Sequence, residues 1–268
     1  MDARARPTRF AVTITALLVV LSVNCRRGGR APAPGVYRGA PVILISIDTL
    51  RADHLALYGY RSGNTPILDG LGRDGIVFDD LYSHLPSHSS LLTGLLPLHH
   101  GVRDNIGFRL GASGETIADR FRAAGYATGA AVSTYVLRHQ TGIARGFDFY
   151  DDAIEIAGTG ESLSESQRDG RLAVEALAAW IDRQSTARLF AFLHLYEPHT
   201  PYDPPPSHRL ANPYDGEIAY ADELVGRFLA RLQSKGLLDQ AVVAVVSDHG
   251  EGLNDHGESE HGIFLYRE

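Results

Sequence analysis

The fold is decided by the stretch VILISIDT, residues 42–49. Its first six residues are apolar except for Ser46, and Asp48 and Thr49 follow directly. A short apolar run without alternation is typical of a strand buried on both faces of a parallel sheet. Polar residues at the carboxyl end of such a strand lie where open α/β sheets bind their ligands. We therefore predict a parallel sheet with a site beside Asp48.

Further apolar runs and amphipathic segments alternate along the chain. We predict additional strands at residues 76–78, 126–132, 189–193 and 241–246. We predict helices at residues 65–75, 115–124, 165–181 and 216–235. The apolar face of the third helix is expected to comprise Leu172, Leu177, Trp180 and Ile181. This alternation predicts an α/β fold with a doubly wound, mostly parallel sheet and helices on both faces. Another apolar run begins at residue 263 and stops by Glu268, so we expect the C-terminal part of the fold to be missing.

The N-terminal region has the pattern of an export signal. Three arginines precede an apolar run at residues 10–21, which is short for a membrane span. We expect residues 1–25 to form a signal peptide or a lipoprotein signal, with Cys25 as a candidate lipid-attachment site and an uncleaved anchor as the alternative. Residues 26–40, rich in Gly, Pro and Arg, are expected to be a linker. The domain at residues 41–268 would then work outside the cytoplasm, in the periplasm or anchored to a membrane.

Composition narrows the range of partners. The chain has 268 residues and a formal net charge of -7, so there is no basic surplus for nucleic acid. Membrane contact is expected only through the N-terminal segment. Cys25 is the only cysteine, so we expect neither a disulfide nor a catalytic thiol in the domain.

A second informative stretch is YSHLPSHSSLLTG, residues 82–94. It predicts a polar loop that runs into a short helix, with Pro86 at the start and Gly94 at the end. We expect the hydroxyls of Ser87 and Ser89 to cap the free N–H groups of the first turn. Hydroxyls and imidazoles at a helix start favour the binding of an anion.

Metal-binding residue types follow three of the predicted strands. Asp48 follows the first, His194 and His199 follow the strand at residues 189–193, and Asp248 and His249 follow the last, with His261 further on. Carboxylates and imidazoles that converge from separate strands are what a divalent metal site needs. Any of the three separate histidines is also a candidate general acid or a donor to substrate oxygens.

Six segments resemble, in order, the sulfatases, which belong to the wider alkaline phosphatase superfamily. They are ISIDTLRADHL (45–55), NTPILD (64–69), PSHSSLLTG (86–94), HGVRDN (100–105), EPHTPY (197–202) and SDHGE (247–251). The resemblance implies a divalent metal held by Asp48, Asp248 and His249. It implies that His199 and His261 contact substrate or complete a second metal site, and that Asn105 donates to the bound anion. Calcium is the metal that the family implies; the imidazole ligand leaves zinc and manganese open.

The chain departs from the family at the nucleophile. In sulfatases a Cys or Ser, converted to formylglycine, stands two residues before the Pro-Ser pair, and related enzymes carry Thr or Ser there. In this chain that position is His84. Ser83 and Ser87 are the nearest hydroxyls, and imidazole is itself able to attack phosphorus. The short approach from Phe78 to Pro86 suggests a small local deletion.

Two functional hypotheses follow. The first is a metal-dependent hydrolase of sulfate esters, or of phosphate or phosphonate esters, acting on small molecules or glycans. The second is a catalytically inactive sulfatase-like binding protein or a truncated gene product, which the residue at position 84 favours. The retained Asp48, Asp248, His249 and His199 favour the first hypothesis.

Overall fold

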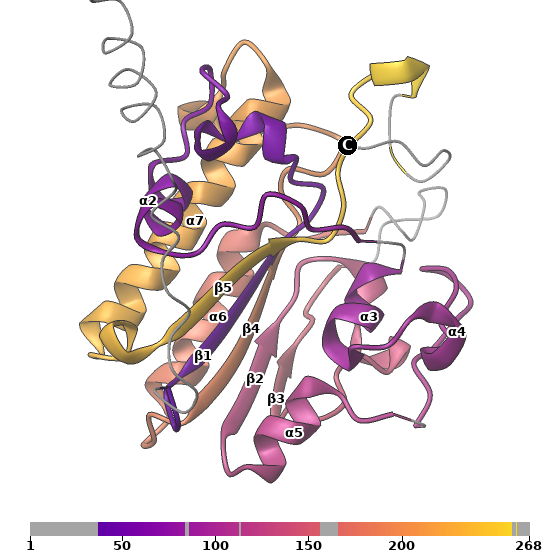
Figure 1. Ribbon diagram of the computed structural model, residues 1–268, viewed down its shortest axis with the longest axis vertical. Coiled ribbons are helices and arrows are strands. Elements are labelled where there is room, and N and C mark those ends of the chain that lie inside the picture. The colour runs from indigo at the N-terminus through magenta and orange to yellow at the C-terminus, as the bar shows by residue number, and fades with distance from the viewer. Residues whose placement is uncertain (1–36, 84–85, 113, 156–165, 259–260, 262–268) are drawn as a thin grey trace, which may run out of the picture. The chain divides into compact units, whose positions relative to one another are not determined.

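A parallel sheet forms the centre of the protein (Figure 1). The structure, a computed structural model, describes residues 37–83, 86–112, 114–155, 166–258 and 261. Within these residues the strands are β1 (Val42–Ile47), β2 (Ala127–Ala131), β3 (Phe149–Asp151), β4 (Leu189–Leu195) and β5 (Val242–Ser247). Their order across the sheet is β3-β2-β4-β1-β5, and every neighbouring pair is parallel.

Helices cover both faces of this sheet, which confirms the doubly wound prediction (Figure 1). One face packs against α6 (Gly170–Asp182) and α7 (Pro213–Ser234), with α2 (Pro66–Asp74) beside α7. The other face carries α3 (Ser87–Thr93) and α5 (Ile117–Ala123), with α4 (Pro97–His100) next to α3. Among the described residues, no helix is long and apolar enough to span a bilayer.

The period-two geometry of β1 divides its side chains between two cores. Ile43, Ile45 and Ile47 join the core that faces α6 and α7, whereas Leu44 joins the core that faces α3 and α5. All four side chains are buried, and each contributes about 1.5–3 kcal/mol by leaving water. The continuous apolar run in the sequence reflects this burial on both faces.

Three of the described helices, α5, α6 and α7, begin where a side chain satisfies a free N–H group. Thr116 and Asp119 form a reciprocal capping box at the start of α5. Asp169 accepts from the N–H of Arg171 and so starts α6, five residues after the predicted beginning. Asn212 caps α7 in the same way.

Four local expectations are wrong. Residues 76–78 form no strand: Ile76 and Phe78 are exposed, and none of the described strands pairs with them. No strand was predicted at residues 142–152, but this segment contains β3, which is held by pairing with β2. Leu172 is exposed on the outer side of α6. Pro86 occupies the N-cap of α3, and within the described part of the chain neither Ser87 nor Ser89 makes a cap hydrogen bond.

Several predictions lie outside the described residues. They are the signal at residues 1–25, most of the linker at 26–40, the position of His84 and the apolar run at 263–266. The boundaries of the predicted domain remain a prediction.

Candidate metal centre and active-site cavity

The strand register brings the two key aspartates together. Ile47 of β1 pairs with Ser247 of β5, so the next residues, Asp48 and Asp248, emerge side by side from the carboxyl edge of the sheet. Both side chains are buried. Their meeting confirms that these strand ends converge on one place.

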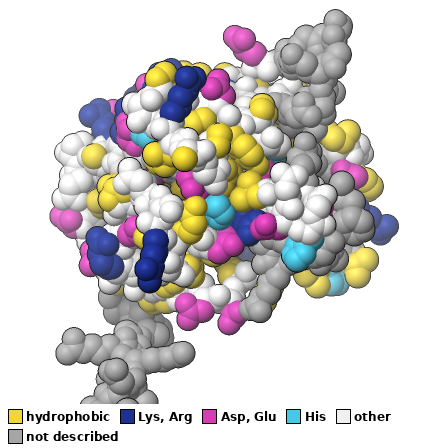
Figure 2. Space-filling model, turned by 90° about the horizontal axis from the view of Figure 1, so that it is seen from above, with side chains coloured by type: hydrophobic (Ala, Val, Ile, Leu, Met, Phe, Trp, Pro, Cys, Tyr) yellow, Lys and Arg dark blue, Asp and Glu magenta, His cyan; other side chains and the backbone are white. Residues whose placement is uncertain are grey.

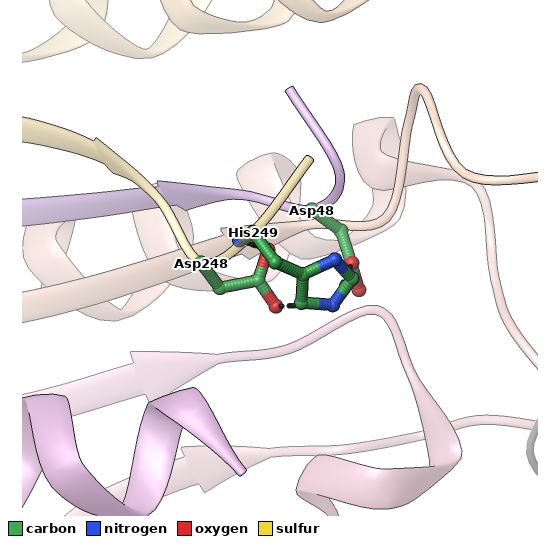
Figure 3. A group of neighbouring side chains, drawn as sticks. All are labelled: Asp48, Asp248 and His249. Atoms are coloured by element: carbon green, nitrogen blue, oxygen red, sulfur yellow. Dashed lines mark hydrogen bonds and ion pairs between the residues drawn. The ribbon is translucent and has the colours of Figure 1, made fainter. Parts of the chain in front are cut away.

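Asp48, Asp248 and His249 form a three-residue cluster (Figure 3). One ligand atom from each lies within 4.8 Å of the other two. His249 Nε2 is 3.3 Å from Asp248 Oδ2 and 3.6 Å from Asp48 Oδ1. His249 Nδ1 donates to the carbonyl of Gly250 at 3.0 Å, because a carbonyl only accepts. In the neutral ring the other nitrogen, Nε2, carries the lone pair and faces the two carboxylates, as a metal ligand would.

The charges in this cluster are not balanced by the protein alone. Burial, and then the neighbouring Asp248, raise the pKa of Asp48 to about 6. Burial alone would raise the pKa of Asp248, but His249 and His88 bring it below its usual value. Asp48 Oδ1 is buried and has no hydrogen-bond partner among the described residues. Two adjacent carboxylates with an orphaned oxygen and an imidazole fit a divalent cation.

Thr49 holds the turn after Asp48 in a strained conformation. Its φ is 51°, in the left-handed region that a β-branched residue rarely adopts. Its N–H donates to Asp248 Oδ1 at 3.1 Å, and its carbonyl accepts from the Tyr214 hydroxyl at 2.6 Å. These two bonds fix the strained turn, which links the backbone at one candidate ligand to the side chain of the other.

A cavity of about 320 Å³ opens above the cluster. Its lining includes Ser87, Asn105, His199 and His261 as well as Asp48, Asp248 and His249. Figure 2, which views the molecule from above, shows histidine and acidic side chains gathered near the middle of this face, with hydrophobic side chains around them. Ser83 is exposed and is not among the described lining residues. The cavity therefore brings together seven of the ten predicted site residues.

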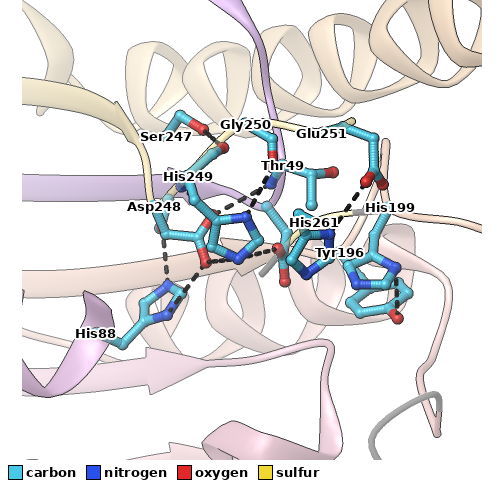
Figure 4. Close-up of polar contacts among 12 residues, drawn as sticks. Thr49, His88, Tyr196, His199, Ser247, Asp248, His249, Gly250, Glu251 and His261 are labelled. Atoms are coloured by element: carbon cyan, nitrogen blue, oxygen red, sulfur yellow. Dashed lines mark hydrogen bonds and ion pairs between the residues drawn. The ribbon is translucent and has the colours of Figure 1, made fainter. Parts of the chain in front are cut away.

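A second group of polar side chains forms one wall of the cavity (Figure 4). His199 Nδ1 donates to the carbonyl of Thr200 at 2.7 Å, which leaves Nε2 for a ligand. The Tyr196 hydroxyl lies 2.8 Å from the same Nδ1. The rings of His199 and His261 meet edge to face at 4.9 Å, and Glu251 Oε1 lies 3.1 Å from His261 Nδ1. This wall presents imidazoles whose orientation is fixed by neighbours.

His194 occupies a different place from the other candidates. It is fully buried in β4, is not among the described residues that line the cavity, and has Nε2 at 3.4 Å from Asp48 Oδ2. Burial lowers its pKa to about 4, so the ring is neutral at pH 7. The structure thus places His194 behind a candidate metal ligand.

Sequence reasoning singled out no role for His88, Thr49 or Glu251. His88 is buried in α3, where burial lowers its pKa to about 4, and its Nδ1 lies 3.5 Å from Asp248 Oδ2. A usable signal was its position in the helix: His88 stands four residues before Leu92, so a polar side chain shares the apolar face. No comparable pattern marks Thr49, whose backbone conformation is visible only in the structure.

Comparison with known proteins identifies the family and the similar folds. The family model described as Sulfatase matches residues 41–264. The arylsulfatase of Clostridium perfringens is 23% identical, over 83% of this chain and 65% of its own length. Among solved structures, a 2-O GAG sulfatase superposes with a TM-score of 0.66 at 17% identity, over 85% of this chain and 61% of its own. The phosphonate monoester hydrolase of Agrobacterium radiobacter gives 0.66 at 21% identity, over 84% of this chain and 66% of its own.

The match covers only part of each of these relatives. The chain spans less than two thirds of the length of each of the three. The structural likeness supports the fold, and the family model extends over most of the predicted domain. The chain belongs to the sulfatase family.

Proposed function

We propose that this protein is a divalent-metal-dependent hydrolase of sulfate esters. The observation that carries the proposal is that Asp48, Asp248 and His249 cluster within 4.8 Å in the cavity that Ser87 and His199 also line. Hydrolysis of a sulfate ester needs a positive centre for the non-bridging oxygens, a nucleophile and a proton donor for the leaving group. The cavity contains residue types suited to each need.

The metal would be held by Asp48, Asp248 and His249. When bound, it would polarise the ester and offset the charge that develops on its oxygens. Two hard carboxylates favour calcium, and the imidazole favours zinc or manganese. Metal dependence and metal identity are both part of the proposal.

Ser87 is the hydroxyl that we assign as the nucleophile. It is buried, opens on the cavity and stands directly before His88, which contacts Asp248. Ser83 is exposed, and the structure does not describe His84. We assign His199 as the proton donor, since its Nε2 is free of the Thr200 contact, and Asn105 and His261 as donors to substrate oxygens.

The substrate and the location follow from the relatives and the sequence. One similar structure is named as a 2-O GAG sulfatase and another as a phosphonate monoester hydrolase. We therefore propose a sulfated glycan or small sulfate ester as substrate, with phosphonate or phosphate esters as slower alternatives. The export signal at residues 1–25 would place the reaction outside the cytoplasm.

A second candidate function is metal binding without turnover. It is favoured by His84, which occupies the position of the family nucleophile and is unable to become formylglycine. In this case the cavity would bind a sulfated ligand and release it unchanged.

Turnover measurements separate the two candidates. The full chain would be assayed with 4-nitrophenyl sulfate, bis(4-nitrophenyl) phosphate and 4-nitrophenyl phenylphosphonate, with metal content determined in parallel. Metal-dependent turnover that Ser87→Ala abolishes and Ser83→Ala preserves is the expected result. Loss of turnover in Ser83→Ala but not in Ser87→Ala would identify Ser83 as the nucleophile. Bound metal with no turnover of any of the three substrates would favour the second candidate function, binding without turnover.

A further inference from the structure

Two buried histidines flank the candidate metal-binding carboxylates. His194 faces Asp48 from within β4, away from the cavity lining, and His88, which also lines the cavity, faces Asp248. His194 is fully buried and His88 is 6% exposed. The hydrogen-bond partners of each ring indicate which of its two nitrogens carries the proton.

The surroundings of His194 determine which nitrogen carries its proton. The backbone N–H of Ser133 points to His194 Nδ1 at 3.5 Å, and an N–H is only a donor. Nδ1 is therefore the acceptor, so the proton of the neutral ring is on Nε2. That nitrogen has no hydrogen-bond partner among the described residues, and Asp48 Oδ2 lies 3.4 Å from it.

His88 has the opposite tautomer. Its Nδ1 faces Asp248 Oδ2 at 3.5 Å, and a carboxylate is only an acceptor. We therefore assign the proton to Nδ1, which makes Nε2 the acceptor for the hydroxyl of Ser46, 3.0 Å away. The order Ser46–His88–Asp248 has the connectivity of a catalytic triad, but Ser46 is fully buried within β1, out of reach of any substrate.

The two imidazole rings also pack against one another. His88 and His194 meet edge to face with their centroids 4.9 Å apart. A rotation of either ring would disturb the other, so the pair behaves as one packed unit. Each partner is anchored further back, by Ser46 in β1 and by Ser133 after β2.

We propose that His88 and His194 are positioning residues that each direct one N–H at one metal-binding carboxylate, Asp248 and Asp48 respectively. Both carboxylates are negative and adjacent, so they repel one another unless donors restrain them. Neutral imidazoles supply oriented donors without adding positive charge, which leaves the full negative charge of the pair for a cation. The inference rests on the proposed metal site.

The opposite tautomers give matched pairs of variants. An Asn side chain places its N–H near the position of His Nδ1, and a Gln side chain places it near Nε2. His88→Asn and His194→Gln should therefore keep the donor, whereas His88→Gln and His194→Asn should misplace it. Affinity for Zn²⁺, Mn²⁺ and Ca²⁺ is measured separately by chelator competition. For each ion that the wild type binds, we expect affinity to fall about 10–100-fold in the second pair and to stay near wild type in the first.

Two measurements keep the test independent of folding and activity. His100→Phe removes another buried histidine, which contacts Ser90 and Val102, and should leave metal affinity unchanged. Imidazole ¹⁵N spectra of the metal-free wild type should show His88 protonated on Nδ1 and His194 on Nε2. The reverse tautomers, or equal affinities in both pairs of variants, would overturn the assignment. A wild type with the expected tautomers that binds none of Zn²⁺, Mn²⁺ and Ca²⁺ would refute the metal site and, with it, the positioning role.

Discussion

Replacing Glu197 with Gln should make the stability of the protein less dependent on pH. Glu197 follows β4 and is buried, with Oε1 accepting from the N–H of Gly170 at 2.8 Å and Oε2 lacking a hydrogen-bond partner among the described residues. Burial, and to a lesser degree the charge of Asp169, raise the pKa of Glu197 from 4.5 to about 7. Gln keeps the acceptor for Gly170 and removes the titration.

Proton linkage determines whether the free energy of unfolding rises or falls with pH. The folded state binds the proton of Glu197 more tightly than the unfolded state, so the free energy of unfolding falls as pH rises from 4.5 to about 7. One pKa unit corresponds to about 1.4 kcal/mol, so ionising this buried group costs the folded state about 3 kcal/mol by pH 8. The Gln side chain does not ionise, so Glu197→Gln does not lose this stability as pH rises. Its stability relative to wild type should therefore rise by about 3 kcal/mol between pH 4.5 and pH 8.

Urea unfolding at pH steps from 4.5 to 8, in the presence of a chelator, measures this difference. The slope m should stay constant while the midpoint moves. Glu217→Gln serves as a second arm, because burial also raises the pKa of Glu217 to about 7 and its Oε1 accepts from the N–H of Asp203. A stability difference between Glu197→Gln and wild type that does not change with pH would refute the reasoning.

Two packing predictions follow from the core. Leu177→Ala in α6 removes a fully buried side chain and should lower the free energy of unfolding by about 2–5 kcal/mol, measured by urea denaturation. Gly129→Ala in β2 should cost about 1–3 kcal/mol, because the added Cβ would lie 2.5 Å from the indole of Trp180. A thermal midpoint equal to wild type for Gly129→Ala would show that the indole moves aside freely.

The sequence predicted those parts of the fold whose signals are local. The apolar runs of β1 and β4 are continuous because both faces of each strand are covered. The run of β5 is also continuous, although in the described structure this edge strand is only partly buried. The polar residues after these strands mark the site. β3 has three residues and depends on its pairing with β2, which no local pattern records. Residues 76–78 have the composition of a strand and lack a neighbour to pair with.

The site also contains residues that the sequence predicted and residues whose contacts only the structure shows. Asp48, Asp248 and His249 follow strand ends, where the sequence predicted a metal site, and the resemblance to the sulfatases implied these three as its ligands. The roles of His88 and His194 depend on Ser46 and Ser133, which lie 42 and 61 residues away along the chain. The strain at Thr49 depends on a hydroxyl from α7. Contacts between such distant segments are set by the folded sheet and were therefore beyond the reach of motif reasoning.

Metal binding tests the central claim most directly. Purified chain would be stripped with chelator and titrated with Zn²⁺, Mn²⁺ and Ca²⁺ in separate calorimetric experiments, alongside Asp48→Ala, Asp248→Ala and the exposed control Asp203→Ala. The account predicts saturable binding of at least one of these ions by wild type and Asp203→Ala, and its loss in both other variants. A wild type that binds none of the three ions, or undiminished binding in Asp48→Ala and Asp248→Ala, would contradict it.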